Sequence, residues 1–193
     1  KNFFDPPDSP IPAYKLNQFG AAVGGPVELP KYSGKNRTFF FVDYQGTRIR
    51  TGQTFLATVA PAPWKAGDFS GFNTIFDPDT NPRQPFPGNR IPASRFDPVA
   101  AKLLQWMPNP NTAGSISPAG VSRNYLTNPI EPNNTDQGDV RVDHKIANSD
   151  SIFARFSMSD QTLTPPSPIP PPLSGAAFSS GDWLNHTRTA VVS

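Results

Sequence analysis

The sequence predicts an all-β fold: an antiparallel sheet of about five strands joined by long, Pro-rich loops. Two observations lead to this prediction, namely alternating apolar and polar residues in several segments and the uneven distribution of the 25 prolines. Proline cannot donate to a β-ladder and is excluded from sheet interiors. Residues 31–60, 133–164 and 173–193 contain no proline, whereas residues 61–132 contain 13 and residues 165–172 contain six. Strands are therefore expected in the proline-free windows.

The clearest alternation lies in residues 139–160, DVRVDHKIANSDSIFARFSMSD. A period of two is typical of a strand with one apolar and one polar face. The small polar residues 147–150 interrupt it as a turn, which predicts a hairpin of strands 138–146 and 151–161. Its apolar face consists of Val140, Val142, Ala154 and Phe156, and its charged face of Asp139, Arg141, Asp143, Lys145 and Arg155.

The length of these two strands favours a membrane barrel. Strands in globular domains usually have about 5–6 residues, whereas a tilted strand needs about 9–11 to cross a bilayer. Charges that alternate in sign on one face are typical either of a solvated sheet or of the lumen side of a membrane barrel. On the barrel interpretation the charged face lines the lumen and the apolar face contacts lipid.

Three further strands are predicted at 17–24, 37–48 and 184–193. In the first, Phe19, Ala21 and Val23 alternate with small or polar residues, a pattern that suits a sheet facing another packed body. In the second, Phe40 and Val42 share a face and join the lipid-facing candidates. The aromatic run 39–41 is typical either of a membrane interface or of any half-buried strand.

Loop lengths separate the two ends of the predicted sheet. Residues 25–36 and 147–150 form short turns, whereas residues 49–135 and 162–183 form long loops. Short turns at one end and long loops at the other are characteristic of outer-membrane barrels. One short helix is expected near 97–106, because Asp97 can cap it and Pro98 suits its first position.

Composition excludes several classes of protein. The 15 Phe, 4 Tyr and 3 Trp are too many aromatic residues for a disordered linker. A net charge of +2 without basic runs gives no nucleic-acid footprint, and the absence of Cys excludes disulfides and thiolate metal sites. No apolar run reaches 18 residues, so no transmembrane helix is predicted. The chain opens at Lys1, and we expect it to be a piece of a longer protein whose targeting segment lies elsewhere.

No residue is predicted to be catalytic, to bind a cofactor or to hold a metal, and the chain is not expected to be an enzyme. His144 and His186 lack a third nitrogen or thiolate ligand for zinc. Residues 77–81 resemble the start of a calcium loop, but Pro82 stands where that loop needs Gly. The aromatic residues of the predicted loops include Trp64, Phe86, Trp106 and Trp183. They are expected either to stack on a ligand or to pack the loops against one another, and packing is the favoured interpretation.

Four segments resemble the start of the barrel in Oar-like TonB-dependent outer-membrane transporters. They are NQFGAAVGGPV (17–27), KNRTFFFVDYQGTR (35–48), FPGNRIPASRFDPVAAKLLQWMPNPN (86–111) and DVRVDHKIANSDSIFARFSMSD (139–160). The resemblance covers nearly the whole chain in the family's order. It implies the N-terminal part of a large single-chain β-barrel in the bacterial outer membrane, which binds and imports a bulky solute, either a carbohydrate, a siderophore or a peptide. Its partners would be outer-membrane lipid and, through a plug domain not present in this chain, the TonB complex.

A secreted or surface-anchored β-rich adhesion module with Pro-rich loops is the alternative. The two hypotheses differ in the surroundings of the apolar strand face. A barrel places Val142 and Phe156 in lipid, whereas an adhesin places them in a dry core.

Overall fold

The computed structural model describes residues 11–173 and 181–193. Contacts within the chain divide it into two compact units. The sheet unit consists of residues 13–51, 130–165 and 181–193; the loop unit consists, in its described part, of residues 11–12, 52–129 and 166–173.

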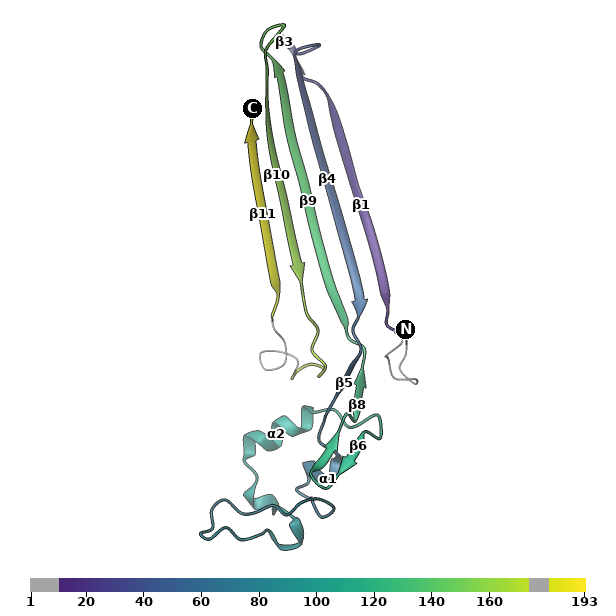
Figure 1. Cartoon of the computed structure of the whole chain (residues 1–193), viewed down its shortest axis with the longest axis vertical. Helices are drawn as coiled ribbons and strands as arrows, with labels where there is room; N and C mark the ends of the chain where they lie inside the picture. Colours follow the sequence, from purple (N-terminus) through teal and green to yellow (C-terminus); the bar gives the residue numbers. More distant parts are fainter. Residues whose placement is uncertain (1–10, 174–180) are drawn as a thin grey trace. The chain divides into compact units, whose positions relative to one another are not determined.

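The sheet unit contains one five-stranded sheet in the order β1-β4-β9-β10-β11 (Figure 1). The strands are β1 (Tyr14–Pro26), β4 (Thr38–Gly52), β9 (Ile130–Lys145), β10 (Ser151–Leu163) and β11 (Trp183–Val192). Neighbours run antiparallel, so the all-β antiparallel fold predicted from the alternation is confirmed. The sheet is open, with β1 and β11 as its edges.

All five strands extend further toward the long loops than the sequence predicts, by one to three residues in β1, β10 and β11 and by more in β4 and β9. β4 continues to Gly52 instead of ending at residue 48, and β9 begins at Ile130 instead of residue 138. The early start of β9 places Pro132 inside a strand. Proline lacks only the donor, and the Pro132 carbonyl still accepts a hydrogen bond from the Thr164 amide at 3.0 Å. The absence of proline was therefore too strict a criterion for predicting where this strand begins.

Short connections close the other end of the sheet. Residues 27–37 contain a small hairpin of β2 (Glu28–Leu29) and β3 (Tyr32–Ser33). Between β9 and β10, the amides of Ile146 and Ala147 both donate to the Asp150 carbonyl, at 2.9 and 3.1 Å. The backbone donors at the start of this turn are therefore satisfied without a longer loop.

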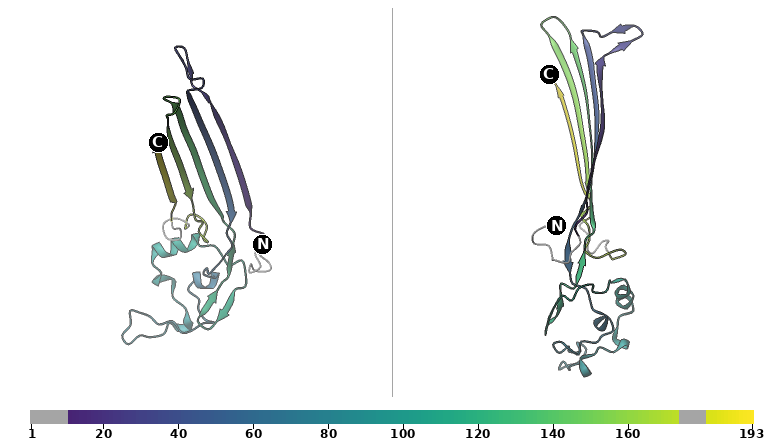
Figure 2. Two further views of the ribbon diagram at one scale, coloured as in Figure 1. Left: turned by 45° about the horizontal axis from the view of Figure 1, so that its top comes forward. Right: turned by 90° about the vertical axis from the view of Figure 1, so that its right-hand side faces the viewer.

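The five-stranded sheet has no hydrophobic core of its own. It is a single layer in both views of Figure 2. Among the described residues, the buried hydrophobic side chains are Val59, Phe86 and Ile169, all of them in the loop unit. Both faces of the sheet therefore present their side chains outward.

The loop unit has more regular structure than the expected long loop 49–135. The helices are α1 (Ala62–Lys65), η1 (Pro87–Asn89), η2 (Ala93–Arg95) and α2 (Pro98–Trp106). The short strand pairs are β5 (Phe55–Ala57) with β8 (Tyr125–Thr127) and β6 (Ser115–Ser117) with β7 (Gly120–Ser122). Residues 174–180 of the other expected long loop, 162–183, lie outside the described residues.

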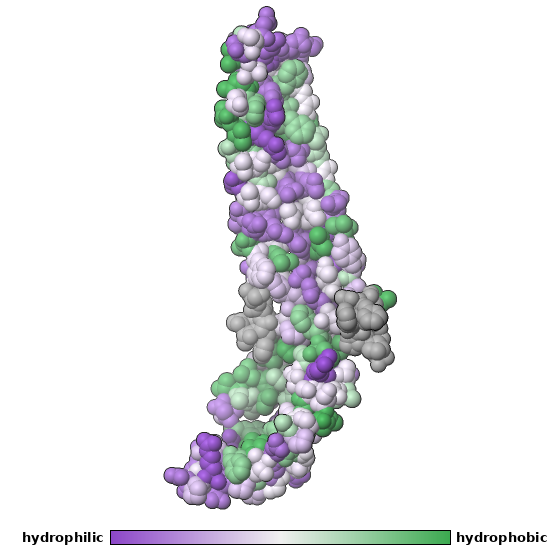
Figure 3. All heavy atoms as spheres, in the orientation of Figure 1, coloured by the Kyte–Doolittle hydropathy of each residue, from purple (hydrophilic) through white to green (hydrophobic). Residues whose placement is uncertain are grey.

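The predicted helix near 97–106 is confirmed as α2. The Asp97 carboxylate accepts from the amides of Val99 and Ala100, both at 2.9 Å, and Pro98 occupies the first turn. These contacts satisfy two of the amides that a helix leaves unpaired at its start. Apolar residues gather over α2 in the space-filling view (Figure 3), where Val99, Leu103 and Trp106 are exposed. No helix in the described ranges is long and apolar enough to cross a membrane.

Candidate functional site

The register of β9 and β10 places the two predicted sets of residues on opposite faces of the sheet. Val140 lies opposite Phe156, and Val142 lies opposite Ala154. Directly opposed residues in an antiparallel pair share a face. Asp139 opposes Ser157 and Arg141 opposes Arg155 on the other face. We call these the even face and the odd face, after the residue numbers on β4, β9, β10 and β11. On β1 the numbering is reversed, because odd-numbered residues such as Val23 lie opposite even-numbered residues of β4.

Contacts between β4 and β9 extend the even face across the sheet. Thr38 Oγ1 lies 2.8 Å from His144 Nδ1, and Arg48 Nη2 donates to Asp136 Oδ1 at 2.7 Å. Both contacts join even positions, so the remaining predicted lipid-facing residues, Phe40 and Val42, lie on the face of Val140 and Val142. Through β1, Val23 joins them opposite Val42.

The charged residues of the odd face form ion pairs along and across the strands. Arg155 on β10 donates to Asp139 on β9 through Nε at 3.0 Å and Nη2 at 2.6 Å, and the Ser157 hydroxyl also contacts this carboxylate. Arg141 donates to Asp143 two residues further on, at 2.6 to 3.1 Å. The Arg141 guanidinium also lies over the Phe153 ring, 4.4 Å from its centroid. The fifth predicted residue, Lys145, forms no ion pair with any described residue.

An apolar band lies on the even face toward the short turns. Val140, Val142 and Phe156 expose 44%, 40% and 45% of their surface. Ala154, Val42 and Phe40 continue the band across three strands. Contiguous apolar surface of this kind marks contact with lipid or with another protein.

A polar belt bounds this band toward the long loops. The Tyr44 hydroxyl donates to Asp136 at 2.5 Å, and Arg48 contacts both oxygens of the same carboxylate, at 2.7 and 3.1 Å. On β10 and β11, Asp160 is 2.7 Å from the His186 ring and 2.8 Å from the Arg188 guanidinium. These belt residues lie on the same face as the apolar band, because all of them occupy even positions.

Aromatic packing supports the belt on β1 and β4. Gly46 lies opposite Phe19, and a Cβ there would come within 2.5 Å of the Phe19 ring. The Phe19 ring therefore occupies the space above Gly46, with its centroid 6.3 Å from that of Tyr44 and 5.4 Å from the Arg48 guanidinium. A larger residue at 46 would displace this ring.

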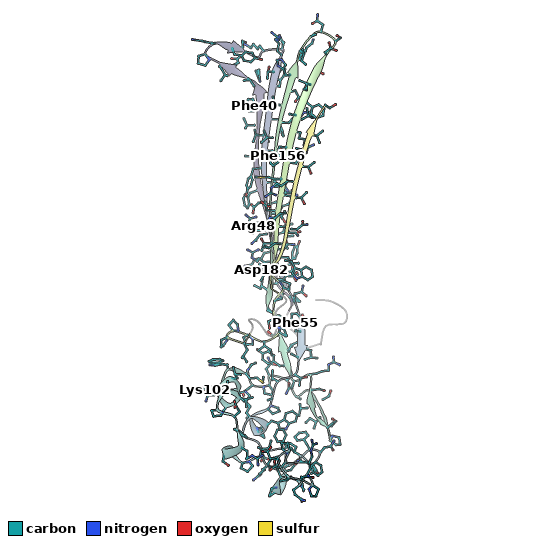
Figure 4. The ribbon with its side chains drawn as sticks, turned by 90° about the vertical axis from the view of Figure 1, so that its left-hand side faces the viewer. Phe40, Arg48, Phe55, Lys102, Phe156 and Asp182 are labelled. Atoms are coloured by element: carbon teal, nitrogen blue, oxygen red, sulfur yellow. The ribbon has the colours of Figure 1, made fainter. Side chains whose placement is uncertain are left out.

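Sequence reasoning did not identify the belt. Asp136 lies between the predicted loop 49–135 and the predicted strand 138–146, and the other belt residues lie in predicted strands but were given no role at a membrane boundary. The alternation itself was the available signal, because Arg48 is the last even-numbered residue of the predicted strand 37–48 and Asp136 continues the even-numbered face of the strand predicted at 138–146. Figure 4 shows Phe40, Phe156 and Arg48 at successive positions along the sheet.

In the loop unit, the predicted aromatic residues divide into two groups. Trp64 packs against Phe69 and Phe72, at centroid distances of 5.4 and 5.1 Å, and Phe86 is buried. Trp106, in contrast, is 52% exposed. Trp183, which belongs to β11 of the sheet unit, is also exposed. Packing thus accounts for two of the four predicted aromatics.

The acidic residues that resemble a calcium loop bind an arginine. Arg95 donates to Asp77 at 2.7 and 2.8 Å and also contacts Asp79. The hydrogen bonds from Arg95, and then the backbone amide of Asp79, hold the pKa of Asp77 below its ordinary value of 3.8. In the described residues no group of three acidic or histidine side chains is arranged to hold a metal ion.

The two-faced sheet and its polar belt agree with a comparison against protein families. A sequence profile of the outer membrane beta barrel domain matches residues 1–193. The chain belongs to this family. No curated protein and no solved structure matches it.

As an outer membrane beta barrel domain, the chain resides in the bacterial outer membrane. The spacing of its polar boundaries is consistent with this location. His144, which bonds Thr38 at the turn end, and Asp136 of the belt are eight residues apart on β9. At about 3.4 Å per residue they are about 27 Å apart along the strand, and a tilt of about 40° reduces the height to about 20 Å. Outward-facing apolar bands of such barrels are about 25 Å tall.

Proposed function

We propose that the chain is part of a TonB-dependent receptor that binds a bulky solute at the cell surface and imports it. In this proposal the even face contacts lipid and the odd face lines the lumen. The observation that carries the proposal is the contrast between the faces within one strand pair. Val142 and Ala154 oppose each other on the apolar face, and the adjacent odd positions hold the Arg155–Asp139 and Arg141–Asp143 ion pairs.

The odd face of β1 supports the presence of a plug inside the barrel. Gly20, Ala22 and Gly24 occupy its odd-face positions, so no large side chain rises from this part of the sheet. A groove is lined there by Gln18, Gly20, Asp43 and Gln45, among others. A second folded body can pack closely against a surface that carries so few large side chains. The plug domain, which lies outside this chain, would be that body and would couple the receptor to TonB.

The loop unit supports the binding step. A pocket within it is lined mainly by apolar side chains, among them Trp64, Ile91, Phe96 and Leu104, with Arg95 and Asp97 as its charged members. Apolar pockets with a few polar groups are the usual form of small-molecule sites. Stacking on sugar rings, or contact with apolar parts of a siderophore or peptide, suits this lining. The chemistry proposed is binding and gating, without covalent catalysis.

The adhesion module remains the second candidate, because the exposed apolar face of α2 is also a feature of protein-binding surfaces. The exposed sheet favours the transporter. An adhesin would have to cover Val140, Val142 and Phe156 with a second layer, and the described chain provides none. Extraction of membranes from producing cells with high salt and carbonate separates the two. A membrane barrel stays in the pellet, and an anchored adhesin that is released by these washes contradicts the transporter.

Uptake by intact cells tests the transporter directly. Cells that produce the full-length protein are given fluorescent oligosaccharides, ferric siderophores and peptides, each with and without a protonophore. One class should accumulate, and the protonophore should abolish its accumulation, because import is energised from the inner membrane. Accumulation that is the same with and without the protonophore would indicate a passive pore. Accumulation no greater than in cells without the protein would contradict import.

A further inference from the structure

Two cations oppose each other on the even face beyond the polar belt. Lys15 on β1 lies directly opposite Arg50 on β4. Directly opposed residues have Cβ atoms about 5 Å apart, and like charges in such a pair destabilise a sheet. Arg48 is the next even-face residue of β4 and adds a third cation beside the pair.

No carboxylate neutralises this pair in the described part of the chain. The Arg50 guanidinium donates to two neutral oxygens, the Ile49 carbonyl and the Asn134 side chain, both at 2.8 Å. The ammonium of Lys15 is exposed and forms no ion pair with a described residue. Asp136, the carboxylate of the nearby belt, already binds Arg48 and Tyr44. The other belt cation, Arg188, is paired with Asp160.

The position of the pair relative to the membrane indicates which anion would bind. Arg50 lies two residues beyond Arg48 of the belt, about 7 Å along the strand. With the apolar band in hydrocarbon, this distance places Lys15 and Arg50 at the level of the polar headgroups. The long loops are at this end of the sheet, so the headgroups are those of the outer leaflet.

We propose that Lys15 and Arg50 bind the phosphate group of a phosphorylated outer-leaflet glycolipid. The inference rests on the lipid-facing assignment of the even face and on the cell-surface location of the long loops. A phosphate suits the site because a guanidinium binds its oxygens through two parallel hydrogen bonds and an ammonium adds a mobile point charge. Bound phosphate converts the repulsion between Lys15 and Arg50 into two attractions. Acyl chains of the same lipid would lie against the apolar band through Val23 and Val42, which oppose each other on the same two strands.

Thermal unfolding of the purified full-length protein in non-ionic detergent tests this site. A phosphorylated glycolipid such as lipid A should raise the Tm, and its dephosphorylated form should not. Replacing both cations (Lys15→Gln with Arg50→Gln) should abolish that rise and weaken glycolipid binding by about tenfold or more, the usual effect of losing charged hydrogen bonds. In detergent alone, Lys15→Gln should leave the Tm unchanged or raise it, because the like-charge pair is relieved.

The matched control removes two cations at the turn end of the sheet unit, with Lys35→Gln and Lys145→Gln. It should keep the full response to the phosphorylated lipid. Equal loss in both double variants, or an equal response to the dephosphorylated lipid, overturns the proposal. A rise of the same size with inorganic phosphate alone identifies a free-anion site and overturns the assignment to lipid. The outcome is independent of the uptake assay, since a receptor that imports nothing can still bind its glycolipid.

Discussion

The side-chain amide of Asn124 pairs with the backbone of Val59 as a neighbouring strand would. Its Oδ1 accepts from the Val59 amide and its Nδ2 donates to the Val59 carbonyl, both at 2.8 Å. Asn124 is only 1% exposed and Val59 2%. In a segment so rich in proline, one side chain thus satisfies two buried backbone groups that no strand reaches.

Asn124→Ala should therefore loosen the loop unit and leave the sheet intact. The Val59 amide and carbonyl would lose their partners in a buried site, at about 1–3 kcal/mol for each group. In limited proteolysis of the full-length protein, a protease should cleave faster within residues 52–129. The heat-modifiable migration of the barrel on gels should not change. Asn111→Ala is the control. Asn111 makes the same pair of bonds with Leu126, at 2.7 Å each, but it is exposed, so water can replace it. Equal sensitivity of both variants would contradict the argument from burial.

Val142→Arg should cost about 2–4 kcal/mol if the residue lies near the bilayer midplane, because a charge would enter hydrocarbon. Arg141→Gln, one residue away on the odd face, should have a much smaller effect, since its partner Asp143 is accessible to water. Urea unfolding of the protein in lipid vesicles measures both. A larger loss from Arg141→Gln would reverse the assignment of the faces.

Spin labels provide a test of the same faces that does not depend on stability. Labels placed singly at positions 142 and 154 in the reconstituted protein should relax faster with oxygen dissolved in the bilayer. Labels at 141 and 157 should respond to a water-soluble nickel chelate, unless a plug shields them. If all four positions respond alike, this strand pair is not a lipid-facing wall.

Asp136→Asn should destabilise the barrel by less than about 1 kcal/mol, although it removes an ion pair. The side chains of Asp136 and Arg48 are 39% and 28% exposed, and pairs accessible to water contribute little. Tyr44→Phe removes only the phenolic hydrogen bond to the same carboxylate and serves as the control. Unfolding free energies in vesicles measure both variants. A loss as large as that of Val142→Arg would place the belt inside the hydrocarbon layer instead of at its boundary.

Acid should weaken the loop unit through Asp77. Arg95 and the Asp79 amide stabilise the ionised carboxylate and lower its pKa from 3.8. A group with a lowered pKa in the folded state stabilises the fold above its unfolded-state value, and this contribution is lost as the pH falls through the folded-state pKa. Pepsin cleavage between residues 77 and 95 should therefore begin to increase as the pH falls below about 3.8 and continue to increase through the lower pKa of the folded state. Asp77→Asn should flatten that rise, and an unchanged profile would assign the acid sensitivity to another group.

Tag insertion tests which end of the sheet faces the cell exterior. A tag at Gly71 should be detected on intact cells, and a tag at Asn148 only after the outer membrane is opened. Gly71 suits insertion because a Cβ added there would meet nothing within 4 Å, whereas a Cβ added at Gly114 would come within 2.4 Å of the Ser122 carbonyl. The reverse labelling pattern would invert the topology.

The alternation of apolar and polar residues was sufficient to predict the strands and to divide their side chains between two faces. Successive side chains of a strand point to opposite faces whatever the strand packs against. The ends of the strands were not predictable in this way. Pro132 excluded the start of β9 from consideration, although its carbonyl takes part in the sheet. The contact between Asp136 and Tyr44 joins residues that are 92 positions apart, on strands separated in the sequence by residues 53–129, and no local pattern specifies that proximity.

The contacts inside the loop unit could not be predicted from the sequence either. Asn124 and Val59 are 65 residues apart, and the carboxylates of Asp77 and Asp79 resembled a calcium loop until Arg95, 16 to 18 residues away, proved to be their partner. Short-range signals sufficed only where the partners were adjacent, as in the capping of α2 by Asp97.

In the membrane orientation proposed above, the polar belt and the His144–Thr38 contact mark the two edges of the hydrocarbon layer. A barrel displaced by one row of residues, about 7 Å along the strand, would bring either Asp136 and Asp160 or His144 into the acyl chains. In a bilayer thicker than the spacing between these boundaries, the lipid must therefore thin around the protein, at a cost of a fraction of a kcal/mol per ångström. Strands that formed such a lipid-facing wall would therefore favour thin regions of membrane and the gathering of barrels where the bilayer is already compressed.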